Sequence, residues 1–398
     1  MIGVFDFMIL SLLGYLGLIL FPRKNSNQAV FAACFGFLSY LHIKRMIEDY
    51  GGWRVDTATM CMIQVCKITS VGFAYRDGEV TKDEEDKLFS HQVKAKLVER
   101  PTFLEYFSYN FSCCGCMLGP YFEYKDFINL MNRSGDYEKI PNTVLPSLKI
   151  YGQAIVLLAL FAGVQILLPP NFIFTEDFGE KNFFYQFGYM YLSLSNRRFQ
   201  FYAAFRLLES SAVASGLGFN GYVDKVPQWD RVICGYAWLI ETVSDPSLVI
   251  KNNIFFRSFR KGESPGFQTN LIVMLVSALW HGFYPIYYIV FIQLAILVEI
   301  AKDVQRYGSF VNKLVPNSIV RYLLAQLFTK YIYSYLILIH FALLLDKAWI
   351  GVKNLKFIPP LMLLSLFLAF KVIVPRVAKR DVKHIIQNAN TIATKKDN

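Results

Sequence analysis

Hydrophobic stretches recur along most of the chain and alternate with short polar links. A membrane-spanning helix needs about 20 largely apolar residues, and candidate spans lie at residues 4–21, 29–43, 58–75, 150–168, 183–194, 202–216, 232–239, 271–280, 287–300, 320–345 and 358–374. The stretch at 232–239 is marginal, and the run Asn196-Arg197-Arg198 separates the spans on either side of it. The pattern predicts an all-α polytopic membrane protein with about ten transmembrane helices.

Three polar segments between these spans carry further information. Residues 42–53 are too polar to cross lipid and end in Gly51-Gly52, so we expect an interfacial elbow. Residues 76–100 mix charges of both signs, which predicts a soluble loop with a short helix. The aromatic segment 101–111 re-enters the membrane and is interrupted by Gly119-Pro120 before Asp126. Broken backbone at membrane depth is tolerated only where protein or a cavity covers it, so we expect an internal chamber.

Composition agrees with this architecture. Of 398 residues, 54% are hydrophobic and only 18% are charged, which is far more apolar than an average soluble domain. The net charge of +11 comes mostly from short links between spans, and an anionic membrane surface explains it more simply than nucleic acid does. No repeat or linker divides the chain, so we predict one membrane domain over residues 1–375 and a basic cytosolic tail over 376–398.

The end of the tail predicts a location. Lys396 and Lys395 are the third and fourth residues from the C-terminus, the form of a dilysine retrieval signal that is read by a retrieval coat. Such a signal requires a cytosolic tail, and the basic residues between 371 and 383 favour that side. We therefore expect a multi-pass protein of the endoplasmic reticulum membrane.

Two short patterns are weighed and set aside. Cysteines gather at 113, 114 and 116, but no nearby histidine completes a zinc set, so we expect packing and no metal. Residues 216–221 match G-x-G-x-x-G, yet a nucleotide site needs a preceding strand, whereas a helix-like apolar run containing Glu209 precedes these glycines. The glycines instead predict a helix break covered by protein.

Histidines in apolar runs are the strongest candidates for chemistry, because ionisable groups are costly at membrane depth. His281 ends the run that opens at Leu271, with Trp280, Gly282 and Pro285 around it. His340 also lies in an apolar run, where it is either functional or satisfied by one hydrogen bond. His42 either caps the elbow or touches a ligand. The sequence contains neither the G-x-S-x-G pattern of Ser-His-Asp hydrolases nor the H-x-x-x-x-D pattern of another class of acyltransferases, so neither class is supported.

Several of these pieces occur in an order that identifies a family. They are 42–46 with 49–51, 101–106 with 119–120, Glu209 with 216–221, Trp229-Asp230, and 278–282 with Pro285 and Tyr287-Tyr288. Together they resemble the membrane-bound O-acyltransferase family, and within it the lysophospholipid acyltransferase branch. The matching pieces run from His42 to about Tyr288, and the branch rests on the elbow and on the glycine-rich piece.

The resemblance implies a helix bundle around a chamber, into which acyl-CoA enters from the cytosol and a lysophospholipid from the bilayer. His281 would be the general base that takes the proton of the free glycerol hydroxyl, and acyl-CoA would be a co-substrate with no further cofactor. Trp280, Tyr284, Glu209, Asn220 and His42 would contact substrate. Arg257 either meets the phosphates of coenzyme A or is ordinary positive-inside charge.

One departure from the family bears on catalysis. The family pairs its histidine with an asparagine in an upstream Trp-Asn pattern, and this chain is shorter than the family pattern between Trp238 and Arg257. Asn253 is our candidate for that role. The predicted function is lysophospholipid O-acylation, and the alternatives are acylation of a protein or a neutral lipid, a catalytically inactive member of this fold, or, less favoured, a transporter.

Overall fold

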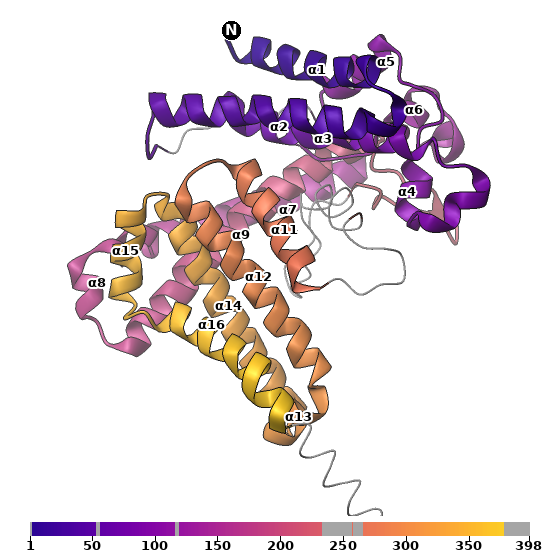
Figure 1. The fold of residues 1–398 in the computed structure, drawn as a ribbon. Coiled ribbons are helices and arrows are strands. Elements are labelled where there is room, and N and C mark those ends of the chain that lie inside the picture. The colour runs from indigo at the N-terminus through magenta and orange to yellow at the C-terminus, as the bar shows by residue number, and fades with distance from the viewer. Residues whose placement is uncertain (1, 53–55, 116–118, 233–256, 258–265, 378–398) are drawn as a thin grey trace, which may run out of the picture. The chain divides into compact units, whose positions relative to one another are not determined.

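The computed structural model describes residues 2–52, 56–115, 119–232, 257 and 266–377 (Figure 1). The described chain is almost entirely helical, which confirms the all-α prediction. It divides into two compact units, one made of Met1–Leu167 and Asn196–Phe283 and the other of Leu168–Ser195 and Tyr284–Asn398. The single membrane domain over residues 1–375 stays a prediction, and each unit is described by itself.

The first unit is built on three helices that pack side by side, α1 (Ile2–Leu20), α2 (Arg23–Glu48) and α3 (Thr57–Asp77) (Figure 1). In its most apolar window α3 is 72% buried, whereas that of α1 is 33% buried. The weaker apolar character of α3 follows from this, because a helix covered by protein can hold polar side chains that lipid would not accept.

The predicted elbow begins later in the chain than we expected. Helix α2 continues past His42 as far as Glu48, and only Asp49 to Gly52 form the turn. Gly51 has a φ of 78°, a left-handed conformation that glycine adopts at little cost. The polar residues at 43–48 did not end the helix, since helical backbone satisfies its own hydrogen bonds whatever its side chains are.

The charged loop that follows α3 is as predicted. It contains a short 3₁₀ helix, η1 (Lys82–Lys87), and one short α-helix, α4 (Ser90–Ala95). The segment after it contains α5 (Phe103–Asn110), α6 (Tyr124–Met131) and η2 (Gly135–Lys139). Helix α5 starts with a capping box between Thr102 and Glu105 and is too short to span a bilayer. Its Tyr106 and Tyr109 are fully buried, so protein covers this broken segment.

Two long helices follow, α7 (Val144–Leu167) and α9 (Phe183–Ala214), joined through η3 (Pro170–Phe174) and α8 (Glu176–Glu180). The prediction of two spans separated at Asn196-Arg197-Arg198 is wrong, because α9 is continuous there. The polar side chains find partners without a break: Asn196 donates to the carbonyl of Phe161 at 2.9 Å, and Arg197 lies over the Phe161 ring.

The glycine-rich segment ends α9, as predicted. Gly216 and Gly221 have φ values of 85° and 79°, which end the helix and lead into a hairpin of β1 (Tyr222–Val223) and β2 (Val226–Pro227). The two strands are antiparallel, with Val223 opposite Val226. The described chain therefore has a helix before the glycines and strands after them, the reverse of a dinucleotide site. The last helix of the first unit is α11 (Phe267–His281).

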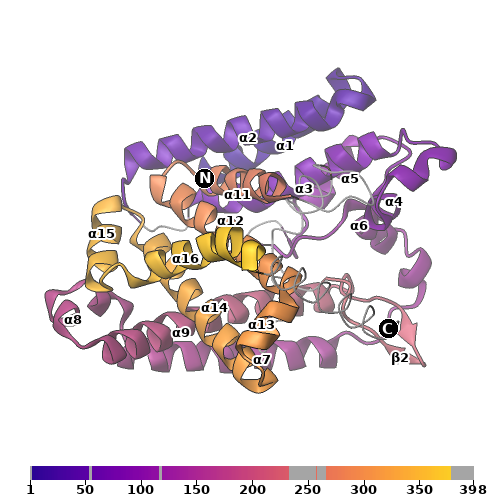
Figure 2. The ribbon, with the colours of Figure 1, turned by 60° about the horizontal axis from the view of Figure 1, so that its bottom comes forward.

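The second unit contains α12 (Pro285–Arg306), α13 (Gly308–Leu314), α14 (Ser318–Ala342), α15 (Leu345–Asn354) and α16 (Ile358–Leu368), which continues as the π-helical turn η5 (Ala369–Ile373). Helices α12, α14 and α16 lie together in both ribbon views (Figure 2). Lys371 of η5 forms ion pairs with Glu299 at 2.9 Å and with Asp303 at 2.7 Å, both on α12. These pairs hold the last span against α12.

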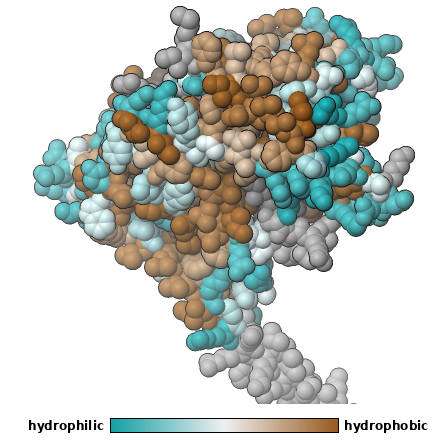
Figure 3. All heavy atoms as spheres, turned by 45° about the horizontal axis from the view of Figure 1, so that its top comes forward, coloured by the Kyte–Doolittle hydropathy of each residue, from teal (hydrophilic) through white to brown (hydrophobic). Residues whose placement is uncertain are grey.

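Seven helices of the described chain are long and apolar enough to cross a membrane. They lie at Gly3–Leu20, Arg23–Glu48, Thr57–Asp77, Val144–Phe174, Pro285–Arg306, Ser318–Ala342 and Ile358–Val377. Apolar side chains cover much of the face drawn in Figure 3. The polytopic prediction is confirmed. The described chain has fewer full-length spans than the ten we expected, because α11 is short and α9, which replaces two predicted spans, does not qualify. The marginal candidate at 232–239 lies almost wholly outside the described residues. The enclosed chamber stays a prediction.

Candidate active site

His281 is the last residue of α11 and is half-buried in the first unit. The helix stops there because Gly282 follows with φ 126° and ψ −162°, a backbone conformation that is essentially restricted to glycine. The amide of Gly282 still closes the last turn by donating to the carbonyls of Ala278 and Leu279. The sequence Trp280-His281-Gly282 thus places an imidazole at a defined helix end.

Trp280 ties this helix end to α3. Its indole Nε1–H donates to the carbonyl of Met62 at 2.9 Å, and its side chain belongs to the core of the first unit. The ring of His281 lies edge-on to the Trp280 ring, with 4.9 Å between centroids. The structure therefore places Trp280 beside the candidate base, where it supports the helix end, and its predicted contact with substrate stays a prediction.

His42 lies at the same place although it is distant in sequence. It is 4% exposed, and its Nε2 is 3.0 Å from the carbonyl oxygen of Trp280. Of the two interpretations weighed from sequence, capping the elbow or touching a ligand, the structure adds a third: the histidine caps the end of α11 from α2.

Arg257 is held at the other end of α3. Its Nη1 and Nη2 donate to the two carboxylate oxygens of Asp77 at 2.8 and 2.5 Å, and its guanidinium lies over the ring of Phe73. Met62 and Asp77 are 15 residues apart on one helix, which corresponds to about 22 Å. The predicted catalytic residue and the predicted phosphate-binding residue are thus anchored at opposite ends of α3.

Two other predicted contacts have partners close in sequence. Glu209, which is buried, accepts hydrogen bonds from Nη1 of Arg206 on both carboxylate oxygens at 2.9 Å. Asn220 is exposed and donates through Nδ2 to Asp230 at 2.9 Å. Neither of these partners belongs to α11, the helix that carries the candidate base His281. Their assignment to substrate stays a prediction.

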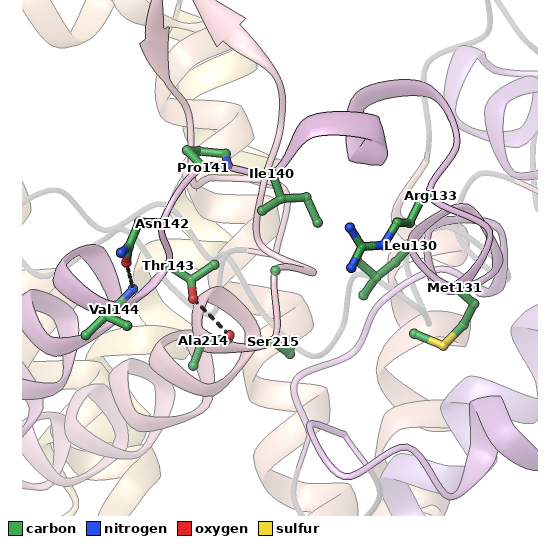
Figure 4. A pocket seen from close by; sticks show the side chains of 11 residues that line it. Leu130, Met131, Arg133, Ile140, Pro141, Asn142, Thr143, Val144, Ala214 and Ser215 are labelled. Carbon is green, nitrogen blue, oxygen red and sulfur yellow. Dashed lines mark hydrogen bonds between the residues drawn. The ribbon is translucent and has the colours of Figure 1, made fainter.

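A pocket of about 670 Å³ opens beside the glycine turn at the end of α9 (Figure 4). Its wall combines polar and apolar side chains, and the guanidinium of Arg133 points toward Ile140 across it. Thr143 donates to the carbonyl of Ala214, and the Asn142 side chain accepts the amide of Val144 at the start of α7. The pocket lies in the first unit, and sequence reasoning did not find it.

Tyr284 and His340 belong to the second unit. Tyr284 is buried at the start of α12, with its ring 6.0 Å from that of Tyr287. His340 lies near the end of α14, with its ring 5.1 Å from that of Tyr287. The functional roles of Tyr284 and His340 stay predictions.

The remaining site predictions fall largely outside the described chain. Asn253, Lys395 and Lys396 lie outside it, so the structure says nothing of them. Among the described residues no group of three or more His, Cys, Asp or Glu side chains is placed to hold a metal ion. Of the cysteine cluster, Cys113 and Cys114 are described, and both are free thiols.

Sequence reasoning missed two polar groups of the first unit, one fully buried and one half-buried. Lys67 on α3 is fully buried, and its ammonium donates to the carbonyl of Tyr109 at 2.7 Å. Glu123 accepts a hydrogen bond from Ser70 at 3.3 Å, and burial raises the pKa of its carboxyl to about 7. A lysine within an apolar stretch was the signal that would have found Lys67.

Comparison with known proteins supports the family suggested by the sequence. The model of the membrane-bound O-acyltransferase family matches residues 20–245 and 250–307. Lysophospholipid acyltransferase 2 of Arabidopsis thaliana is 27% identical to this chain, over 94% of this chain and 85% of the length of the relative. Lysophospholipid acyltransferase of Saccharomyces cerevisiae is 28% identical, over 64% of this chain and 47% of its own.

A human relative, membrane-bound glycerophospholipid O-acyltransferase 2, is 29% identical over 75% of this chain and 61% of its own. The names of these relatives confirm the lysophospholipid branch that the elbow and the glycine-rich piece predicted. The family model matches well over half of the residues of this chain, and the chain therefore belongs to the membrane-bound O-acyltransferase family.

Proposed function

We propose that the protein is a lysophospholipid O-acyltransferase of the endoplasmic reticulum membrane, which transfers a fatty acyl group from acyl-CoA to the free glycerol hydroxyl of a lysophospholipid. The names of its relatives support the substrate class. The observation that carries the chemistry is the position of His281 at the end of α11, where Gly282 stops the helix and Trp280 anchors it.

In the proposed reaction, the imidazole of His281 accepts the proton of the glycerol hydroxyl as its oxygen attacks the thioester carbon. The new C–O bond forms as the C–S bond breaks, and the proton passes on to the departing coenzyme A thiolate. A neutral imidazole has the right basicity near pH 7, and a positioned general base contributes about 10²- to 10⁴-fold in rate. Exclusion of water prevents hydrolysis of the thioester.

Acyl-CoA is the proposed donor because a long, flexible donor suits the arrangement along α3. The phosphates would lie near Arg257 at the Asp77 end of the helix. The thioester would lie toward the Met62 end, about 22 Å away along the helix axis, where Trp280 anchors the helix that carries His281. Arg257 has a carboxylate partner, so it would bind phosphate together with other basic residues. Asn253 is proposed to assist His281, and Lys395 and Lys396 to return the protein to the endoplasmic reticulum.

Acyl transfer from labelled acyl-CoA to a panel of lysophospholipids tests the proposal, with membranes that carry the wild type or His281→Ala. We expect the wild type to form diacyl phospholipid and His281→Ala to lose at least about 100-fold of that activity. His91→Ala is the matched control, because His91 lies on α4 in the charged loop and has no proposed role.

The other outcomes separate the alternatives. Equal activity of the wild type and His281→Ala would refute the role of His281 as base. Activity toward a protein or a neutral lipid alone would move the protein to another substrate class. No transfer to any acceptor would indicate an inactive member of the family, which the short segment before Arg257 favours.

A further inference from the structure

His42 and Trp280 form a hydrogen bond between residues 238 positions apart in sequence. The acceptor is the backbone carbonyl of Trp280, and a carbonyl oxygen can only accept. The Nε2 of His42 must therefore carry the proton in this bond, which selects one form of the neutral ring. Because His42 is 4% exposed, little of the ring is left open to a substrate.

The bond closes a helix end that would otherwise leave polar groups unpaired. The last four carbonyls of an α-helix have no partner within the helix. At the end of α11, the amide of Gly282 serves the carbonyls of Ala278 and Leu279, and His42 serves that of Trp280. The last turn before His281 is thus fixed partly from another helix.

Trp280 is held from two directions at once. Its carbonyl accepts from His42 on α2, and its indole donates to Met62 on α3 at 2.9 Å. Two bonds from two helices fix both the rotation of the last turn about the α11 axis and its height along that axis. His281 is the next residue, so the direction of its Cα–Cβ bond follows from them.

Gly282 is fitted to the same arrangement. A Cβ atom at this position would lie 3.3 Å from both Cγ and Nδ1 of His42, closer than most real Cβ contacts. Its φ of 126° would also strain any other residue. The glycine after His281 therefore does two things: it stops the helix and leaves room for the His42 ring.

We propose that His42 is a positioning residue for His281, acting through the carbonyl of Trp280, and that it does not contact substrate. This inference rests on the proposed function, since it assigns a supporting group to the proposed base. Reacting groups must be placed accurately, and a displacement of about 1 Å costs about 100-fold in rate. We expect that loss of the bond, which leaves the indole of Trp280 as the remaining anchor described above, lets the last turn of α11 shift by that order.

Two substitutions separate the bond from the ring. His42→Leu keeps an apolar side chain but removes the donor, and His42→Gln keeps an N–H donor in place of Nε2. We expect His42→Leu to lower kcat by about 100-fold while KM for the lysophospholipid stays within about twofold. His42→Gln should recover most of the lost kcat.

A second measurement does not depend on activity. Hydrogen exchange of backbone amides in residues 278–283, followed by mass spectrometry, should speed up in His42→Leu and stay near the wild type in His42→Gln, because the closed turn protects those amides. His91→Leu is the matched control and should leave both measurements unchanged.

The outcomes distinguish this inference from the proposed function. An inactive wild type contradicts the proposed function, and the exchange measurement then still tests the bond. An active wild type with unchanged kcat in His42→Leu overturns the inference, as does unchanged exchange at 278–283. Equal loss of kcat in both variants also overturns it, because it assigns the effect to the imidazole itself rather than to the bond.

Discussion

The Asp77–Arg257 pair allows a quantitative test of how the segment before α11 is anchored. Asp77 is 1% exposed, and its two oxygens accept hydrogen bonds of 2.8 and 2.5 Å from Arg257. Removing one partner of a buried pair leaves the other charge uncompensated and costs about 3–5 kcal/mol. Two features relieve part of that cost: the Arg257 side chain is 15% exposed to water, and Arg76 also pairs with Asp77 at 3.6 Å. We therefore expect about 3 kcal/mol, the lower end of this range, for either single change.

The assay is chemical denaturation of the purified protein in detergent. Asp77→Leu and Arg257→Met should each lower the free energy of unfolding by about 3 kcal/mol, and the double variant by much less than their sum. Lys87→Met is the matched control, since its pair with Glu84 is exposed and should contribute less than about 1 kcal/mol. Additive losses in the double variant would refute the buried-pair reasoning.

The same variants test the proposed phosphate contact. If Arg257 binds the phosphates of acyl-CoA, Arg257→Met should raise KM for acyl-CoA more than Asp77→Leu does, because only the first removes the positive charge. Equal effects of the two variants would assign Arg257 to anchoring alone.

Two further predictions concern the first unit. Burial raises the pKa of Glu123 from 4.5 to about 7, so the folded protein holds this proton more tightly than the unfolded chain; stability should therefore fall as pH rises between these values, by up to about 3 kcal/mol. Glu123→Gln should remove this contribution, so the difference between the thermal midpoints at pH 5 and pH 8 should change from the wild type to the variant. The same difference in both proteins would contradict the role of Glu123. Tyr137→Phe leaves the carbonyl of Leu217 without its 3.1 Å donor and should cost about 1–2 kcal/mol in the same denaturation assay; a loss below about 0.5 kcal/mol would count against that bond.

Sequence reasoning found much of this architecture because length and apolar character decide whether a helix can span lipid. It also singled out His281 as the candidate base, because the ring lies in an apolar run beside Trp280, Gly282 and Pro285 and because this piece resembles the family's. It failed at Asn196-Arg197-Arg198, where a polar run did not end α9. Sequence alone does not show that the carbonyl of Phe161 and its ring accept those side chains.

The sequence by itself therefore determined the class of fold, the family and the candidate base. Only the tertiary structure decided what supports that base, because the supporting contacts join residues far apart in the chain. His42 reaches Trp280 across 238 positions, and Arg257 reaches Asp77 across 180. Local patterns report which side chains are costly in lipid, and packing decides which partners satisfy them.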